Sequence, residues 1–152
     1  MSAPAPAAVL LIVLIDDDPD DVAVALRAAR RSQLPVQVVV FHDGREALAA
    51  LGLLDTGDEA SWLRPCAIFL DIKMPLLDGW EMLRRLRDHA RTKGVPIIVQ
   101  SWSTRREDIE RCYSLGANSF VAKRLTPDEP GSYFTDAVRY WVHLNQSPWA
   151  SA

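Results

Sequence analysis

The stretch AIFLDIKMPLLDGW, residues 67–80, places an acid, Asp71, directly after four consecutive apolar residues. An apolar run without polar alternation is typical of a strand that is buried on both faces of a parallel sheet. The Pro and Gly that follow indicate a turn, and Asp78 can cap a helix that begins after it. A carboxylate at the end of such a strand is either a helix cap or a group positioned for chemistry.

Similar units occur along the rest of the chain. The apolar runs occupy residues 9–15, 36–41, 67–70, 96–100 and 119–122. Capping residues indicate helix starts at Asp18, Asp43, Asp78 and Thr104, and a last helix is expected from about Ser132 to Asn145. Five strand–helix units joined by right-handed crossovers predict an α/β fold, an open, doubly wound, five-stranded parallel sheet with five helices.

The composition indicates one domain. The chain has 152 residues, of which 49% are apolar and 24% charged, and this is an ordinary globular balance. We expect the domain at residues 9–145, a flexible Ala/Pro tail at 1–8 and a C-terminal tail at 146–152.

Charge and cysteine content exclude several classes of protein. The net charge of −3 provides no electrostatic footprint for nucleic acid or anionic lipid. No apolar run approaches the roughly 18–20 residues of a membrane span. Cys66 and Cys112 are not spaced as a metal-binding pair or a disulfide framework, which suits a reducing compartment. We therefore expect a cytoplasmic protein that binds neither nucleic acid nor membrane.

Chemically capable side chains follow the predicted strands. In an open doubly wound sheet, ligands bind outside the carboxyl ends of the strands. The residues at these ends are Asp16, Asp17, Asp71, Ser101 and Lys123. Carboxylates that share a site repel each other unless a cation neutralises them, and hard oxygen ligands suit Mg²⁺. A carboxylate beside Mg²⁺, with a lysine and a hydroxyl opposite, can accept a phosphoryl group.

These residues carry a family resemblance. LIDDDPDD, LDIKMPLLDG, Ser101, Phe120 and Lys123 resemble the receiver domain of bacterial two-component response regulators over roughly residues 9–145. The separations agree, with 30 residues from Asp71 to Ser101 and 52 from Asp71 to Lys123. The resemblance implies a flavodoxin-like, CheY-like fold with strand order 2-1-3-4-5. It also implies a single-domain regulator that receives a phosphoryl group from a sensor histidine kinase and is not an enzyme in its own right.

The resemblance also implies a role for each site residue. Asp71 is the expected phosphoacceptor. The expected Mg²⁺ ligands are Asp16, Asp17 as the more direct ligand, Asp71 and the backbone carbonyl of Lys73. The expected phosphoryl contacts and switch residues are Ser101, Lys123, the backbone amide of Trp102, and Phe120.

Two positions depart from the family pattern. Trp102 follows the switch hydroxyl, where receivers usually have a small residue. Its indole either narrows access to the site or turns outward to join a partner surface. Arg124 stands where many receivers have proline, which leaves the geometry of the Lys123–Arg124 bond open.

The last predicted helix suggests a protein contact. Its larger side chains spread over more than one stripe, and those expected at an interface are Tyr133, Phe134, Tyr140, Trp141 and Leu144. The alternative is a wide stripe that faces the core. We expect no output domain after this helix, so the signal would be a phosphorylation-dependent protein contact. This C-terminus is similar to that of stand-alone receivers paired with bacterial phytochromes and related hybrid sensor kinases, which implies a homodimer.

Two other functions compete with this interpretation. Asp16 and Asp18 after an apolar strand also resemble the nucleophile and acid of haloacid dehalogenase-type phosphatases, although Asp20 stands where Thr or Val is expected. The second alternative is a scaffold with a receiver fold that takes no phosphate, which only Trp102 favours.

Overall fold

The computed structural model describes residues 2–3, 9–74, 77–124 and 128–148 of the chain. One parallel sheet has the strand order β2-β1-β3-β4-β5. The strands are β1 (Leu10–Ile15), β2 (Val36–Phe41), β3 (Ala67–Asp71), β4 (Ile97–Ser101) and β5 (Ser119–Ala122). The predicted α/β fold class and strand order 2-1-3-4-5 are confirmed, and every strand boundary lies within one residue of its predicted run.

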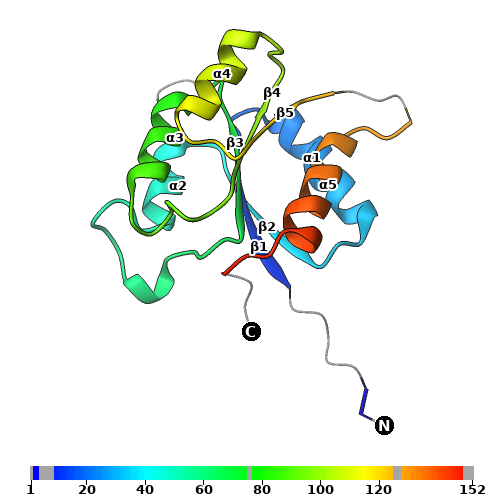
Figure 1. Cartoon of the computed structure of the whole chain (residues 1–152). Helices are drawn as coiled ribbons and strands as arrows, with labels where there is room; N and C mark the ends of the chain where they lie inside the picture. Colours follow the sequence, from blue (N-terminus) through cyan, green and yellow to red (C-terminus); the bar gives the residue numbers. More distant parts are fainter. Residues whose placement is uncertain (1, 4–8, 75–76, 125–127, 149–152) are drawn as a thin grey trace.

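In the described part of the chain, five α-helices cover the two faces of the sheet. α1 (Pro19–Ser32) and α5 (Ser132–Arg139) lie against one face (Figure 1). α2 (Gly44–Ala50), α3 (Gly79–Asp88) and α4 (Arg106–Ser114) lie on the other side (Figure 1). A short 3-10 helix, Glu59–Ser61, lies in the long connection before β3. None of the described helices is both long and apolar enough to cross a lipid bilayer.

Each face of the sheet buries its own hydrophobic core. Along β3, Ile68 and Leu70 pack into one core, whereas Ala67 and Phe69 pack into the other. The Phe69 ring meets Phe134 of α5 edge-to-face, with centroids 5.1 Å apart. Burying an aromatic or branched side chain of this size contributes roughly 1.5–3 kcal/mol. Because both faces of β3 are covered, its sequence is apolar at every position before Asp71.

Three of the four predicted helix caps are confirmed. Asp18 accepts from the backbone amides of Asp20 and Asp21, and thereby fixes the start of α1 beside the end of β1. Asp43 accepts from the amide of Arg45, and Asp78 accepts from the amide of Glu81. Such caps contribute about 1 kcal/mol each.

The predicted cap at Thr104 is wrong. α4 begins after Arg105, which makes no side-chain capping bond. The Ser103 hydroxyl instead accepts from the Arg105 amide at 3.2 Å and donates to Asp108 at 2.5 Å. These bonds order the residues just before α4, and the Thr104–Glu107 pair that matches a capping box is not used.

The last helix is shorter than predicted in its regular part. α5 ends at Arg139 and continues as a wider π-helical segment, Tyr140–Leu144, in which the amide of Asn145 donates to the Tyr140 carbonyl at 2.9 Å. Phe134, Val138 and Val142 form the stripe that packs on the sheet. The helical coil as a whole therefore covers the predicted length, although its last turns are not α-helical.

The loop after β3 packs tightly at Gly79. The Gly79 amide donates to the Ile72 carbonyl at 3.1 Å. A Cβ at this position would clash with the Ile72 Cα and would lie 2.6 Å from the Asp71 carbonyl oxygen. The start of α3 is thus held directly against the backbone that carries Asp71, and only a residue without a side chain fits.

We expect Gly79→Ala to lower the free energy of unfolding by at least about 2 kcal/mol, because the clash is with backbone that cannot rotate away. Gly94→Ala is the matched control, since an added Cβ there meets nothing within 4 Å. Urea unfolding of both variants checks this. Equal midpoints for the two variants would contradict the packing described here.

Candidate functional site

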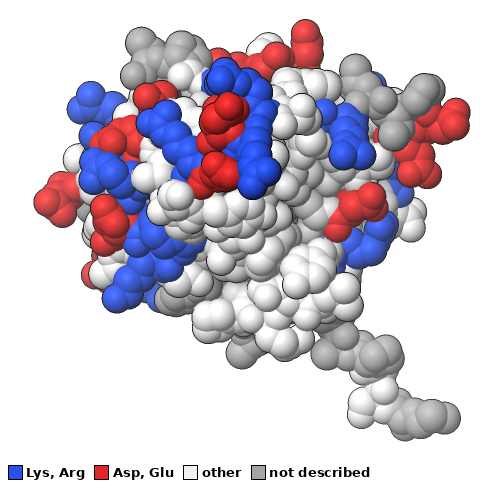
Figure 2. Space-filling model, turned by 45° about the horizontal axis from the view of Figure 1, so that its top comes forward, with Lys and Arg blue, Asp and Glu red and all other residues white. Residues whose placement is uncertain are grey.

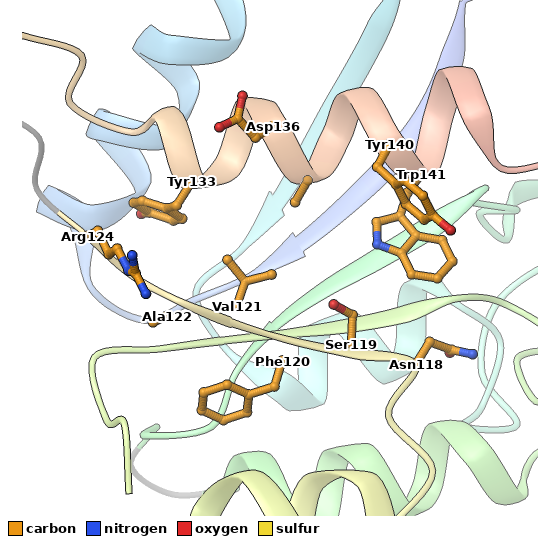
Figure 3. A pocket seen from close by; sticks show the side chains of 11 residues that line it. Asn118, Ser119, Phe120, Val121, Ala122, Arg124, Tyr133, Asp136, Tyr140 and Trp141 are labelled. Carbon is orange, nitrogen blue, oxygen red and sulfur yellow. The ribbon is translucent and has the colours of Figure 1, made fainter.

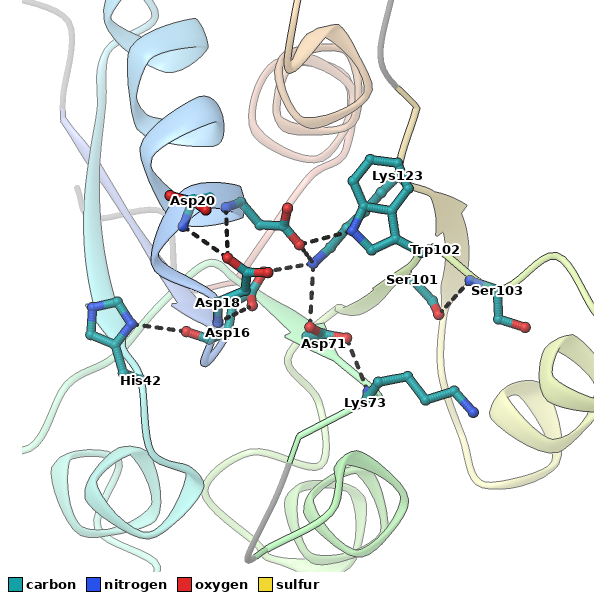
Figure 4. Close-up of polar contacts among 11 residues, drawn as sticks. Asp16, Asp18, Asp20, His42, Asp71, Lys73, Ser101, Trp102, Ser103 and Lys123 are labelled. Carbon is teal, nitrogen blue, oxygen red and sulfur yellow. Dashed lines mark hydrogen bonds and ion pairs between the residues drawn. The ribbon is translucent and has the colours of Figure 1, made fainter.

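The site lies at the carboxyl edge of the sheet and is centred on Lys123, the residue after β5. Its Nζ lies 2.7 Å from Asp16 Oδ2 and 3.3 Å from Asp71 Oδ2 (Figure 4). It also lies 2.8 Å from Oδ2 of Asp21, in the first turn of α1. The Lys123 side chain is 0% exposed. The ends of β1, β3 and α1 thus each direct a carboxylate at one buried ammonium group.

Backbone hydrogen bonds fix two of these carboxylates. Asp16 Oδ1 accepts from the Asp18 amide at 3.0 Å, and Asp71 Oδ1 accepts from the Lys73 amide at 3.0 Å. In both side chains the other oxygen, Oδ2, is the one that contacts Lys123. The imidazole of His42 lies 3.1 Å from the Asp16 carbonyl and so adds a contact from the end of β2. The acceptor oxygens are therefore oriented by the local turns after each strand.

The charges in the site are unequal. Burial raises the pKa of Asp71 to about 6; Lys123 opposes this rise and the neighbouring Asp16 reinforces it. Burial disfavours the charged form of Lys123, but Asp71, Asp16 and Asp21 outweigh it, so that the pKa of Lys123 is raised above its usual value. One ammonium group therefore faces three carboxylates, and the site lacks positive charge.

This deficit fits a divalent cation. Asp16, Asp21 and Asp71 each offer a carboxylate oxygen, and these oxygens lie within 4.8 Å of one another. Several carboxylate oxygens at an accessible edge suit Mg²⁺, which keeps part of its water shell. Asp17, the predicted direct ligand, is half-buried and is not in this group. Its role and that of the Lys73 carbonyl stay predictions.

The structure places the other predicted site residues around this centre. Ser101 is buried at the end of β4, and its hydroxyl accepts from the Ser103 amide at 3.1 Å. Phe120 is half-buried on β5 and packs against the core that includes α3. The Lys123–Arg124 bond is trans, as are all the peptide bonds in the described residues. The Lys123 amide donates to the Ser101 carbonyl at 2.8 Å, which ties the two strand ends together.

Trp102 lies beside Lys123 (Figure 4), and the residue is 51% exposed. Its indole nitrogen donates to Asp21 Oδ2 at 2.9 Å. This contact holds the indole at the site, and both interpretations of Trp102 stay predictions.

Sequence reasoning missed Asp21 as a site residue. Asp21 lies in the first turn of α1, where an acid is favourable next to the helix N-terminus in any protein, so its position alone does not indicate a site. The available signal was the combination of the Asp18 cap with Pro19, which fixes where α1 begins and so places Asp21 on the turn beside the end of β1.

Of the five predicted interface residues, two are buried, two are exposed and Trp141 is half-buried. Phe134 is 0% exposed and packs on Phe69, so its assignment to an interface is wrong, because helical spacing places it with Val138 in the core stripe. Tyr133 is also buried, and burial raises its pKa to about 12. Tyr140 and Leu144 are 51% and 70% exposed.

A groove runs along the free edge of the sheet between β5 and α5 (Figure 3). Its volume is about 620 Å³, and its lining includes Phe120, Arg124, Tyr133, Tyr140 and Trp141. The rings of Tyr140 and Trp141 meet edge-to-face, with centroids 5.0 Å apart. The exposed aromatic surface predicted from the last helix is thus present in the turns beyond Arg139.

Charged side chains do not segregate on the face shown in Figure 2. Lys and Arg alternate there with Asp and Glu instead of forming one basic surface. This distribution agrees with the net charge of −3. On this face, Lys and Arg do not form an extended surface of the kind that neutralises a nucleic acid backbone.

Comparison with known proteins gives a consistent result. Residues 12–130 match the family model described as "Response regulator receiver domain". The response regulator Rcp1 of Synechocystis sp. is 26% identical over 113 residues, which cover 74% of this chain and 76% of Rcp1.

Two solved structures are similar over nearly the whole chain. The phosphorylated cyanobacterial phytochrome response regulator RcpA superposes with a TM-score of 0.83 at 29% identity, covering 93% of this chain and 99% of RcpA. The receiver domain of the sensor histidine kinase PA1611 from Pseudomonas aeruginosa, with a magnesium ion coordinated in its active-site cleft, superposes with a TM-score of 0.69 at 25% identity, covering 88% and 98%.

The raised pKa of Asp71 has a consequence for stability. Folding moves this pKa from 3.8 to about 6. In the folded state the carboxyl group therefore holds its proton more tightly, and its ionisation costs stability as the pH rises from about 4 to about 6. We expect Asp71→Asn to be more stable than the wild type at pH 7 in a metal chelator, by about 1–3 kcal/mol.

The difference should shrink as the pH falls through 6 toward 4, because the wild-type carboxyl group then becomes neutral as well. Urea unfolding at several pH values measures it. Asp55→Asn, at an exposed position, is the control and should change stability by less than about 0.5 kcal/mol. A loss of stability in Asp71→Asn at pH 7 would contradict the electrostatics of the site.

Proposed function

The chain belongs to the response regulator receiver domain family, and on that premise we propose that it accepts a phosphoryl group on Asp71 in a Mg²⁺-dependent reaction. One observation carries the proposal. The Asp71 carboxylate stands at the end of β3, fixed by the Lys73 amide and 3.3 Å from the buried ammonium of Lys123. A nucleophile held at the rigid end of a strand, beside a cation, is arranged for phosphoryl transfer.

The residues divide the work of the reaction. A carboxylate oxygen of Asp71 attacks phosphorus, the bond from phosphorus to the nitrogen of the donor phosphohistidine breaks, and that nitrogen keeps the electron pair. Lys123 neutralises a phosphoryl oxygen, and the Ser101 hydroxyl and the Trp102 amide donate hydrogen bonds to the bound group. Asp16, Asp17, Asp71 and the Lys73 carbonyl would hold the metal. Bound Mg²⁺ supplies positive charge at the phosphoryl oxygens.

The family signals rather than acting as a classical enzyme, and receiver domains of two-component systems are phosphorylated by histidine kinases. In our proposal the chain catalyses only its own phosphorylation and dephosphorylation. The likeness to RcpA and Rcp1 supports a phytochrome-type or related hybrid sensor as the donor and a stand-alone mode of action. Two buried free cysteines fit a reducing compartment, so we place the protein in the cytoplasm.

A homodimer through the C-terminal turns is the second part of the proposal. The exposed side chains of Tyr140 and Leu144 lie at the end of α5, next to the groove between β5 and α5. Exposed aromatic and aliphatic side chains that are neighbours on a surface usually mark an interface. Lys123 directly follows β5, and β5 lines this groove. A movement of Lys123 on phosphorylation can therefore change the surface through β5.

The phosphatase alternative lacks its acid. Asp18 Oδ1 caps α1 by accepting from two backbone amides, and Asp16 is paired with Lys123. The family match assigns the chain to receivers instead. The other alternative, a scaffold that takes no phosphate, is tested by measuring the intact mass after treatment with a phosphodonor.

We expect incubation with a small phosphodonor to add one phosphoryl group to the wild type only when Mg²⁺ is present, as measured by intact mass. Asp71→Asn should remain unmodified, because an amide does not replace the nucleophile. Asp88→Asn is the matched control at an exposed acid and should be modified normally. A folded wild type that gains no mass under any condition would identify the chain as a scaffold.

Sedimentation velocity tests the dimer. We expect the wild type to dimerise as its concentration rises, more strongly with a phosphoryl mimic, and the Tyr140→Ser, Leu144→Ser double variant to dimerise at least about tenfold more weakly, since it loses exposed apolar contact area. Tyr113→Ser, at an exposed aromatic on α4, is the control. A wild type that stays monomeric throughout would eliminate this part of the proposal.

A further inference from the structure

One oxygen of Asp21 has two donors from distant parts of the chain. Asp21 Oδ2 accepts from Lys123 Nζ at 2.8 Å and from Trp102 Nε1 at 2.9 Å. The three residues come from α1, from the segment after β4 and from the segment after β5. This arrangement connects three separate elements directly above the phosphoacceptor.

The position of Lys123 reflects this contact. Its ammonium group is 2.7 Å from Asp16 and 2.8 Å from Asp21, but 3.3 Å from Asp71. Lys123 is therefore held mainly by the two carboxylates at the α1 side of the site. A phosphoryl group on Asp71 brings new negative charge and competes with Asp21 for the same ammonium.

Trp102 strengthens the hold of Asp21 on Lys123. Its N–H occupies the second acceptor direction of Asp21 Oδ2 and fixes the carboxylate in place. The Asp21 side chain is only 14% exposed although it lies in the first turn of a helix at the surface. A hydrogen-bonded ion pair that is shielded from water is stronger than one in open solvent.

We propose that Asp21 is a positioning residue that retains Lys123 in the unphosphorylated arrangement, and that the Trp102 indole N–H holds Asp21 in the orientation required for this. The inference rests on the proposed function of Asp71 and assigns a regulator to the same site. The Asp21–Lys123 contact must be given up when Lys123 turns to a phosphoryl group. Asp21 and Trp102 thereby lower the affinity of the site for the phosphorylated state.

The test measures the affinity for beryllofluoride, a phosphoryl mimic, at saturating Mg²⁺. Asp21→Asn keeps the shape of the side chain and removes its charge. Trp102→Phe keeps a ring and removes only the N–H. We expect each variant to bind beryllofluoride about 3- to 10-fold more tightly than the wild type. In the double variant, the affinity should rise by less than the product of the two single fold-changes, because both substitutions disrupt the same Trp102–Asp21–Lys123 contact.

Trp62→Phe is the matched control. Its indole also donates one hydrogen bond, to the Thr56 carbonyl at 3.1 Å, but it lies in the connection that enters β3 at the end opposite to Asp71. It should leave the affinity unchanged. In addition, the fluorescence of Trp102, obtained as the difference between wild type and Trp102→Phe, should change when beryllofluoride binds, and this change should be lost in Asp21→Asn.

The contrary outcomes are distinct. Wild-type affinity in both single variants would overturn the positioning role while leaving the function of Asp71 intact. Tighter binding in Trp102→Ala but not in Trp102→Phe would mean that the ring acts by its bulk alone, against this proposal. If Asp21→Asn binds Mg²⁺ more weakly, and its affinity for beryllofluoride at saturating Mg²⁺ equals that of the wild type, then Asp21 is a metal ligand and not a positioning residue. A wild type that binds no beryllofluoride and takes no phosphate would instead refute the proposed function itself.

Discussion

The structure depends on one buried ammonium group. Parallel strands bring their carboxyl ends to the same edge of the sheet, and in this chain the end of β1, the end of β3 and the first turn of α1 each place a carboxylate there. Lys123 is the cation that allows these carboxylates to share the edge, and its own burial is tolerated only because they surround it. The acids and the lysine therefore stabilise one another.

The same arrangement leaves the site short of positive charge, and this shortage is what makes it chemically useful. Three carboxylates against one ammonium favour a divalent cation, and a bound cation would further stabilise the ionised, nucleophilic form of Asp71, whose pKa burial raises to about 6. In the proposed reaction, a phosphoryl group on Asp71 would redistribute these charges. Because the Lys123 amide is bonded to the Ser101 carbonyl, the two expected phosphoryl contacts belong to strand ends that are already joined.

The fold and most of the site follow from patterns that are local in the sequence. Strands β1 and β3 are apolar at nearly every position because both faces are covered, and Asp18, Asp43 and Asp78 cap helices as their surroundings predict. Contacts across the fold could not be found in this way. The Asp21–Lys123 pair spans 102 residues, and the Asp21–Trp102 pair spans 81. Phe134 was misassigned because the sequence shows which residues share a helical stripe but not which stripe faces the sheet.

The most direct test of this account is the position of the phosphoryl group in the chain. Borohydride reduces an aspartyl phosphate to homoserine, so peptide mapping after reduction identifies the carboxylate that was modified. The account predicts homoserine at position 71 alone, and only after treatment with a phosphodonor and Mg²⁺. Homoserine at position 16 or 21, or at none, would contradict the assignment of Asp71 as the acceptor around which Lys123 and the acidic cluster are organised.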